Sequence, residues 1–200
     1  MISLDHNNLH LEVLGISGSL RKGSFNTALL RAAQELAPNG MEVTVFDLAD
    51  IPLYNGDVEA AGDPEPVAAL KSAIHNADGV LFATPEYNYS VSGVLKNSID
   101  WASRDRSAGS LQGKPVAMMG AGGMAGTARA QLHLQNVLSE AGALVMVKPG
   151  VLVTLPWQKS DEVGRLVDED TWAFLRRHLD FFGEWIQRVG TPGEALVAQR

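Results

Sequence analysis

With 200 residues, 46% of them hydrophobic and 20% charged, the chain has the size and composition of one globular domain, which excludes a disordered, collagen-like or disulfide-stapled scaffold. The net charge of −7 argues against a nucleic-acid partner, because phosphate contacts need a basic surface, and the absence of cysteine excludes thiolate zinc sites and a cysteine nucleophile. No apolar run is long enough for a membrane helix, and the first residues are polar where a signal peptide would be apolar, so we expect a soluble cytoplasmic protein without a membrane partner.

Short apolar runs alternate with amphipathic stretches along the chain. The runs predict strands, and apolar residues that recur on one face predict helices. In chain order, the expected elements are strand 11–17, helix 28–36, strand 42–46, helix 66–75, strand 78–84, helix 91–103, strand 115–119, helix 128–140, strand 143–147 and helix 168–189.

This alternation predicts a parallel sheet with helices on both faces. The strands are almost continuously apolar, as expected when helices cover both faces of the sheet. Five strands joined by right-handed crossovers favour the order 2-1-3-4-5 of a flavodoxin-like three-layer α/β sandwich over the six-stranded dinucleotide-binding fold. We expect one such domain over residues 11–190, between loose tails at residues 1–10 and 191–200.

Three loops reach the carboxyl edge of the predicted sheet, where open α/β sheets bind their ligands. The first joins strand 11–17 to the N-terminus of the next helix, where free N–H groups and the helix dipole favour an anion. It matches neither the G-x-G-x-x-G pattern nor the G-x-x-x-x-G-K-[ST] pattern. Its hydroxyls and its arginine suit a terminal phosphate monoester, and a simple helix-capping loop is the alternative. Its side-chain donors include Ser17, Ser19, Arg21, Ser24 and Asn26.

The other two loops have features that suit a flat heterocycle. In the second loop, Pro85 stiffens the exit from strand 78–84, Tyr87 and Tyr89 offer flat surfaces, and the N–H groups of residues 86–88 can face the edge of a ring. In the third loop, the four glycines among residues 120–126 let a backbone approach a ring closely. An ordinary turn and a flexible connection are the respective alternatives.

The segments SGSLRKGSFN (17–26), TPEYN (84–88) and LKN (95–97) resemble the NADPH-dependent FMN reductase family, which is close to the NAD(P)H quinone reductases. The similarity runs from about residue 12 to residue 153, and it implies a flavodoxin-like fold that holds FMN noncovalently. Similar proteins carry a hydroxyl residue before the glycines of the third loop. This chain has Ala121 and Gly122 there, so we expect one side-chain hydrogen bond to the flavin to be missing.

The resemblance also assigns the cofactor-binding residues. It implies phosphate contacts from Ser17, Ser19, Arg21, Ser24 and Asn26, and contacts to the isoalloxazine ring from Pro85, Glu86, Tyr87 and Asn88. The further cofactor-binding residues are Phe25 of the first loop and Gly122 and Gly123 of the third.

We therefore expect an oxidoreductase that transfers hydride from NADPH or NADH to bound FMN and then electrons to a quinone or a similar small acceptor, in a ping-pong reaction that needs no catalytic side chain and no metal. One alternative is a flavodoxin-like electron carrier without an NAD(P)H site. Another is a Rossmann NAD-binding protein, in which Asp47 at the end of strand 42–46 would bind the ribose, although a turn aspartate is the simpler interpretation.

The resemblance further implies a homodimer or homotetramer. Tyr54, Tyr89 and Trp101 lie near the predicted flavin edge, where aromatic side chains suit an interface. Segment 53–55 resembles the part of the family that reaches toward a neighbouring subunit, and an ordinary surface loop is the alternative.

Overall fold

The computed structural model describes residues 10–104 and 109–190, so the expected tails lie outside the described residues except for His10. Its centre is a sheet of five parallel strands in the order β2-β1-β3-β4-β5, which confirms the predicted flavodoxin-like topology. The strands are β1 (Leu11–Ser17), β2 (Met41–Phe46), β3 (Gly79–Ala83), β4 (Pro115–Gly122) and β5 (Leu144–Thr154). The helices are α1 (Phe25–Leu36), α2 (Gly56–Ala61), α3 (Glu65–Asn76), α4 (Gly93–Ala102), α5 (Ala128–Glu140) and α6 (Glu169–Val189), with a short 3-10 turn at Pro156–Gln158.

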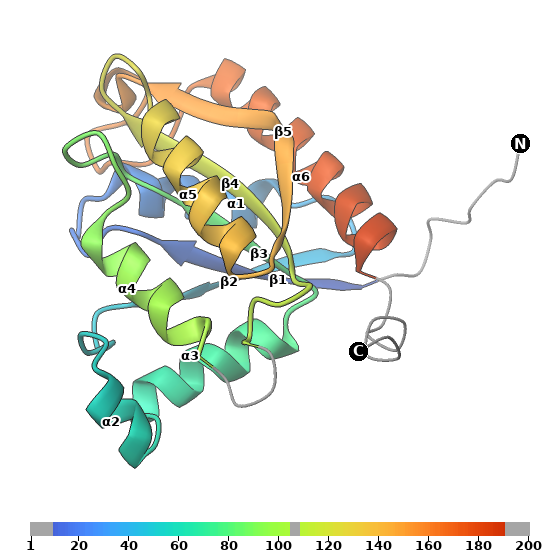
Figure 1. Ribbon diagram of the computed structural model, residues 1–200. Helices are drawn as coiled ribbons and strands as arrows, with labels where there is room; N and C mark the ends of the chain where they lie inside the picture. The colour runs from blue at the N-terminus through green and yellow to red at the C-terminus, as the bar shows by residue number, and fades with distance from the viewer. Residues whose placement is uncertain (1–9, 105–108, 191–200) are drawn as a thin grey trace, which may run out of the picture.

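Helices cover both faces of the sheet (Figure 1). One apolar core lies under α1 and α6, and a second lies under α3, α4 and α5. Successive strand residues point to opposite faces, so Leu81 belongs to the first core while Val80 and Phe82 belong to the second. This double burial explains why the strands read as continuous apolar runs instead of alternating ones.

Strands β4 and β5 are longer than the sequence predicted. β4 was expected to end at residue 119 but continues to Gly122, so the start of the third loop belongs to the sheet. β5 was expected to end at residue 147 but pairs with β4 as far as Thr154, past an irregularity in register between Ala117 and Met119 of β4. The charged Lys148 and the proline at position 149 interrupt the apolar pattern, so the sequence does not predict the second half of β5.

Two further expectations need correction. Helix α2 was not predicted, because none of its residues is buried and it therefore has no apolar face; the side chain of Asn55 caps it by accepting a hydrogen bond from the N–H of Asp57. Trp101 is fully buried in the core, and its indole N–H donates to the carbonyl of Pro52 at 2.9 Å. Trp101 therefore cannot contact a second subunit.

Along the described parts of the chain, no helix combines the length and the apolarity needed to cross a membrane.

Candidate functional site

The first two loops interlock at the carboxyl edge of the sheet. The N–H of Gly18 donates to the carbonyl of Ala83 at 2.9 Å, and the hydroxyl of Ser92 donates to the carbonyl of Gly18 at 2.6 Å. A Cβ atom on Gly18 would lie only 2.9 Å from Cδ of Pro85, so a larger residue does not fit there. The glycine therefore holds the loop after β1 directly against the exit of β3.

The first loop presents hydroxyls and free N–H groups around the start of α1. Ser24 caps the helix by accepting a hydrogen bond from the N–H of Thr27 at 3.3 Å, and the hydroxyls of Ser17 and Thr27 lie 2.9 Å apart. The N–H groups of Gly23 and Phe25 donate to no group among residues 10–104 and 109–190. N–H groups without an acceptor at a helix N-terminus can bind an anionic group.

A cavity of about 370 Å³ opens beside this loop. Three of the residues predicted to contact a phosphate, Ser17, Ser19 and Arg21, are among those that line this cavity. Further basic side chains, Lys22 and Arg31, contribute to the same wall. In a chain with a net charge of −7, this local excess of positive charge fits a phosphate group.

Two polar residues near the loop are already engaged within the protein. The Asn26 amide is buried: its nitrogen donates to the carbonyl of Ala121 at 3.0 Å, and its oxygen accepts from the Ala121 N–H at 2.9 Å. Asn26 therefore ties α1 to β4. Asp47 lines the cavity, but its carboxylate accepts from the N–H of Ala49 at 3.0 Å, which is the ordinary role of an aspartate in a turn.

The second loop forms a tight turn that exposes two tyrosines. The N–H of Ser90 donates to the carbonyl of Tyr87 at 3.0 Å, and the N–H of Tyr87 donates back at 3.1 Å. The two central residues, Asn88 and Tyr89, have φ values of +49° and +67°, as a type I′ turn requires. Tyr87 and Tyr89 are 53% and 67% exposed, and the Tyr87 hydroxyl lies 3.5 Å from that of Ser19 in the first loop.

Glu86 points its carboxylate toward α5, where it replaces a missing helix cap. The N-cap residue Thr127 makes no capping hydrogen bond with its side chain. Instead, Glu86 accepts from the N–H groups of Arg129 and Ala130 at 3.0 and 3.2 Å, and from Nε of Arg129 at 2.6 Å. Burial alone would raise the pKa of Glu86, but these hydrogen bonds and the positive charge of Arg129 together lower it. The backbone N–H groups of Glu86 and Asn88 have no acceptor among the described residues.

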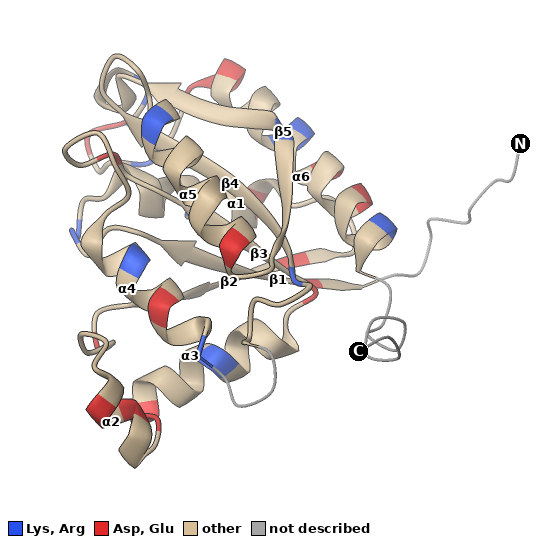
Figure 2. Cartoon of the chain, in the orientation of Figure 1, with Lys and Arg blue, Asp and Glu red and all other residues tan. Residues whose placement is uncertain are grey.

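Arg129 is a site residue that sequence reasoning missed. The first turn of α5 carries a basic residue and the last turn an acidic one (Figure 2), which is the opposite of what the helix dipole favours. A basic residue at this end needs a carboxylate beside it, and Glu86 supplies one from 43 positions earlier in the chain. Nothing in the local sequence pattern signals this partnership.

The glycines of the third loop serve mainly internal packing. A Cβ atom on Gly120 would collide with Oγ1 of Thr127, and one on Gly122 would collide with the carbonyl oxygen of Gly126. Gly123 has open space where a Cβ would stand. Of the two glycines predicted to approach the flavin, Gly122 is explained by contacts within the protein, and Gly123 faces an unobstructed surface.

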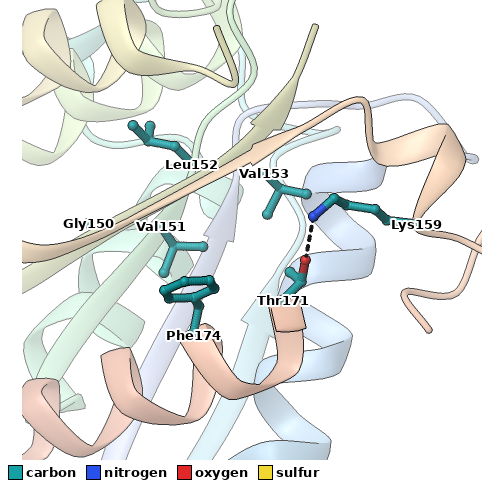
Figure 3. A pocket seen from close by; sticks show the side chains of 7 residues that line it. All are labelled: Gly150, Val151, Leu152, Val153, Lys159, Thr171 and Phe174. Atoms are coloured by element: carbon teal, nitrogen blue, oxygen red, sulfur yellow. Dashed lines mark hydrogen bonds between the residues drawn. The ribbon is translucent and has the colours of Figure 1, made fainter. Parts of the chain in front are cut away.

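A second cavity, of about 210 Å³, lies between β5 and α6 (Figure 3). The ammonium of Lys159 on its wall donates to the hydroxyl of Thr171 and to the carboxylate of Asp168, both at 3.1 Å. Hydrogen bonds from Thr171, together with Lys159, lower the pKa of Asp168 against the opposing effect of burial. Lys159, Asp168 and Thr171 satisfy one another's hydrogen-bonding groups at the start of α6, so we assign them a structural role.

The chain is similar to known reductases that use NAD(P)H. The sequence pattern of the family described as NADPH-dependent FMN reductase matches residues 11–158. The chain is 46% identical over 180 residues to an NAD(P)H-dependent FMN reductase of Pseudomonas aeruginosa, covering 90% of this chain and 97% of that protein. It is 46% identical over 185 residues to a quinone reductase of Escherichia coli, with the same coverage of 90% and 97%.

Among solved structures, the flavoenzyme NAD(P)H:(acceptor) oxidoreductase FerB of Paracoccus denitrificans superposes with a TM-score of 0.83 at 38% identity. The match covers 90% of this chain and all of that one.

Proposed function

The chain belongs to the NADPH-dependent FMN reductase family, and from this premise we propose that it uses one open site to move electrons from NAD(P)H to a quinone in two separate half-reactions. Bound FMN supplies the redox chemistry, since it accepts a hydride from a nicotinamide and gives electrons to a small acceptor. The contribution of the protein is to bind the flavin, to orient it and to leave one of its faces open.

The observation that carries this proposal is the meeting of three loops at one sheet edge, with a polar, basic hollow at one end and an exposed tyrosine turn at the other. The hydroxyl contact at 3.5 Å between Ser19 and Tyr87 joins the two ends. A molecule with a phosphate at one end and a flat ring at the other fits a site that is basic at one end and aromatic at the other.

At the phosphate end, we assign direct contacts to Ser19, Arg21 and the free N–H groups at the start of α1, including that of Phe25. Charge-assisted hydrogen bonds from a guanidinium and from a helix N-terminus are the strong kind for a phosphate. Ser17 and Ser24 are buried in the base of the loop and hold its shape. Asn26, whose amide is bonded to Ala121, positions α1 instead of contacting phosphate.

At the ring end, Pro85 sets the exit of β3, and the N–H groups of Glu86 and Asn88 are available to the ring edge. The Tyr87 side chain is exposed next to these N–H groups, and Gly123 of the third loop has open space at its Cβ position. The carboxylate of Glu86 accepts hydrogen bonds from Arg129, so only the backbone of Glu86 is available to the flavin. None of these groups is a proton donor or acceptor that the hydride transfer requires, and no protein nucleophile takes part.

The shared site predicts a kinetic pattern. If the nicotinamide and the quinone occupy the same open face in turn, initial rates measured while both are varied give parallel double-reciprocal lines. Activity is unchanged in EDTA, because no metal takes part. Intersecting lines would show both substrates bound at once and would exclude a shared site, and a metal requirement would exclude the proposed chemistry.

We further propose that the protein is a homodimer or homotetramer whose contact surface lies near the site. Leu53 is 83% exposed, although the backbone N–H of its neighbour Tyr54 is fixed by Oδ1 of Asn97 at 2.8 Å. An apolar side chain held outward by such bonds suits a contact with a second copy.

A further inference from the structure

We propose that Glu86 and Arg129 are positioning residues: their ion pair fixes the turn of residues 87–90 in place before a flavin binds, so that the ring half of the site is preformed. This inference rests on the proposed flavin site and adds to it, because neither side chain touches the flavin in the role assigned here.

The first support is the completeness of the Glu86 contacts. Its side chain is only 8% exposed, and both carboxylate oxygens accept hydrogen bonds from α5. A buried carboxylate so fully paired cannot move away without leaving a charge unsatisfied. The residue that begins the second loop is thereby locked to the helix that follows the third loop.

The second support is the contact between Arg129 and the turn itself. The guanidinium carbon of Arg129 lies 3.8 Å from the centre of the Tyr89 ring, a close cation–π contact. Tyr89 and the preceding Asn88 both have positive φ. Asparagine adopts this conformation readily, but a bulky residue such as Tyr89 does so only when its surroundings enforce it. One arginine therefore pairs with Glu86 before the turn and packs on Tyr89 within it.

A third contact closes the arrangement on the far side of the turn. The hydroxyl of Ser90 lies 3.0 Å from Nδ1 of His133, one turn of α5 beyond Arg129. The turn is thus held at both of its ends and at its exposed ring by the same helix. All these contacts join residues of one chain, so none of them requires an atom of the flavin.

This arrangement separates two contributions to flavin affinity. The ion pair acts on the ring half, whereas Arg21 and the start of α1 act on the phosphate. Loss of the pair must therefore weaken the binding of FMN and of riboflavin, which has no phosphate, by the same factor.

The test measures dissociation constants of the apoprotein for FMN and riboflavin by flavin fluorescence, in the wild type, Glu86→Gln, Arg129→Met and the double variant. We expect each single variant to bind both flavins about tenfold more weakly, and the double variant to be no weaker than the worse single one, since the two side chains act as a unit. Arg165→Met, which removes an exposed ion pair with Glu35, is the control and should bind both flavins normally.

Unchanged affinities in the single variants, additive losses in the double variant, or a loss confined to FMN would each overturn the proposal. Arg129→Lys is the conservative variant: it keeps the charge but loses the flat guanidinium, and it should recover only part of the affinity. Failure of the wild type to bind either flavin would instead refute the proposed function.

Hydrogen exchange in the apoprotein tests the ion pair without any flavin. The amides of Tyr87 and Ser90, which bond across the turn, should exchange faster in Arg129→Met and in Arg129→Lys than in the wild type. Equal exchange rates would contradict a positioning role even if flavin binding were lost.

Discussion

Arg21 is the residue whose removal separates binding from folding. Its guanidinium donates to the carbonyl of Gly23 at 2.7 Å and lies 5.4 Å from the ring centre of Phe25, so it is held over the first loop without an acidic partner among the described residues. Its side chain is exposed, and no core contact depends on it.

We expect Arg21→Ala to purify folded but poor in flavin. The lost charged hydrogen bonds are worth about 1.5–3 kcal/mol, which corresponds to roughly 10- to 100-fold in FMN affinity. Fluorescence titration of the apoprotein checks this, with riboflavin as the control ligand because it lacks the phosphate. An unchanged FMN affinity would refute the phosphate assignment.

Gly120 and Gly123 form a matched pair for testing the third loop. Alanine at Gly120 would collide with Thr127 and with the carbonyl of Thr84, whereas alanine at Gly123 meets open space. Overpacking typically costs about 1–3 kcal/mol, so Gly120→Ala should lower the free energy of unfolding and Gly123→Ala should not. Urea denaturation compares them. Equal stabilities would mean that the close contacts at Gly120 relax without cost.

At the scale of elements, helix α6 carries a buried titratable group. His178 is fully buried, its Nδ1–H donates to the carbonyl of Pro149 at 2.8 Å, and burial lowers its pKa to about 4. The ordinary pKa of 6.5 applies to the unfolded chain, so between these two values the unfolded state binds the extra proton. Stability is therefore full above pH 6.5 and falls as the pH falls toward 4.

From about pH 7.5 to about pH 5, this single histidine should cost the wild type about 2 kcal/mol of unfolding free energy. His178→Gln should be less stable at neutral pH but should lack this part of the pH dependence. Urea unfolding of both proteins over that range measures the difference in slope. Parallel curves for the two proteins would show that His178 does not titrate on unfolding.

The elements that the sequence predicted well are those with one dominant signal. The apolar runs of β1 and β3 and the amphipathic pattern of α5 gave bounds close to those observed, because burial alone determines them. The second half of β5 was missed because edge pairing to β4 tolerates Lys148 and Pro149, and pairing leaves no local pattern.

The site divides in the same way. For the first loop, the sequence predicted phosphate contacts that include Ser24 and left helix capping as the alternative, and the structure shows Ser24 as the cap of α1. The long-range hydrogen-bond partners were not identifiable. Asn26 bonds to Ala121 and Glu86 bonds to Arg129, across 95 and 43 positions, and no local pattern in a single sequence indicates which distant residues pair.

For the whole molecule, we expect a dimer or tetramer. The 21.4 kDa chain exposes Leu53 and Tyr89 at the edge that carries the site, and closed two-fold assemblies are the commonest among homo-oligomers. Light scattering at micromolar concentration should give at least twice the chain mass. A monomer with flavin bound would contradict this expectation. Leu53→Asp should shift the assembly toward monomer, whereas Val163→Asp, at a similarly exposed position, should not.

The most direct test of the account is one anaerobic visible spectrum of the purified protein, recorded before and after NADPH and then after a benzoquinone. We predict bands of bound oxidised flavin at roughly 375 and 450 nm that bleach with NADPH and return with the quinone. A colourless protein that takes up no added FMN, or a flavin band that NADPH and NADH both leave unchanged, would contradict it.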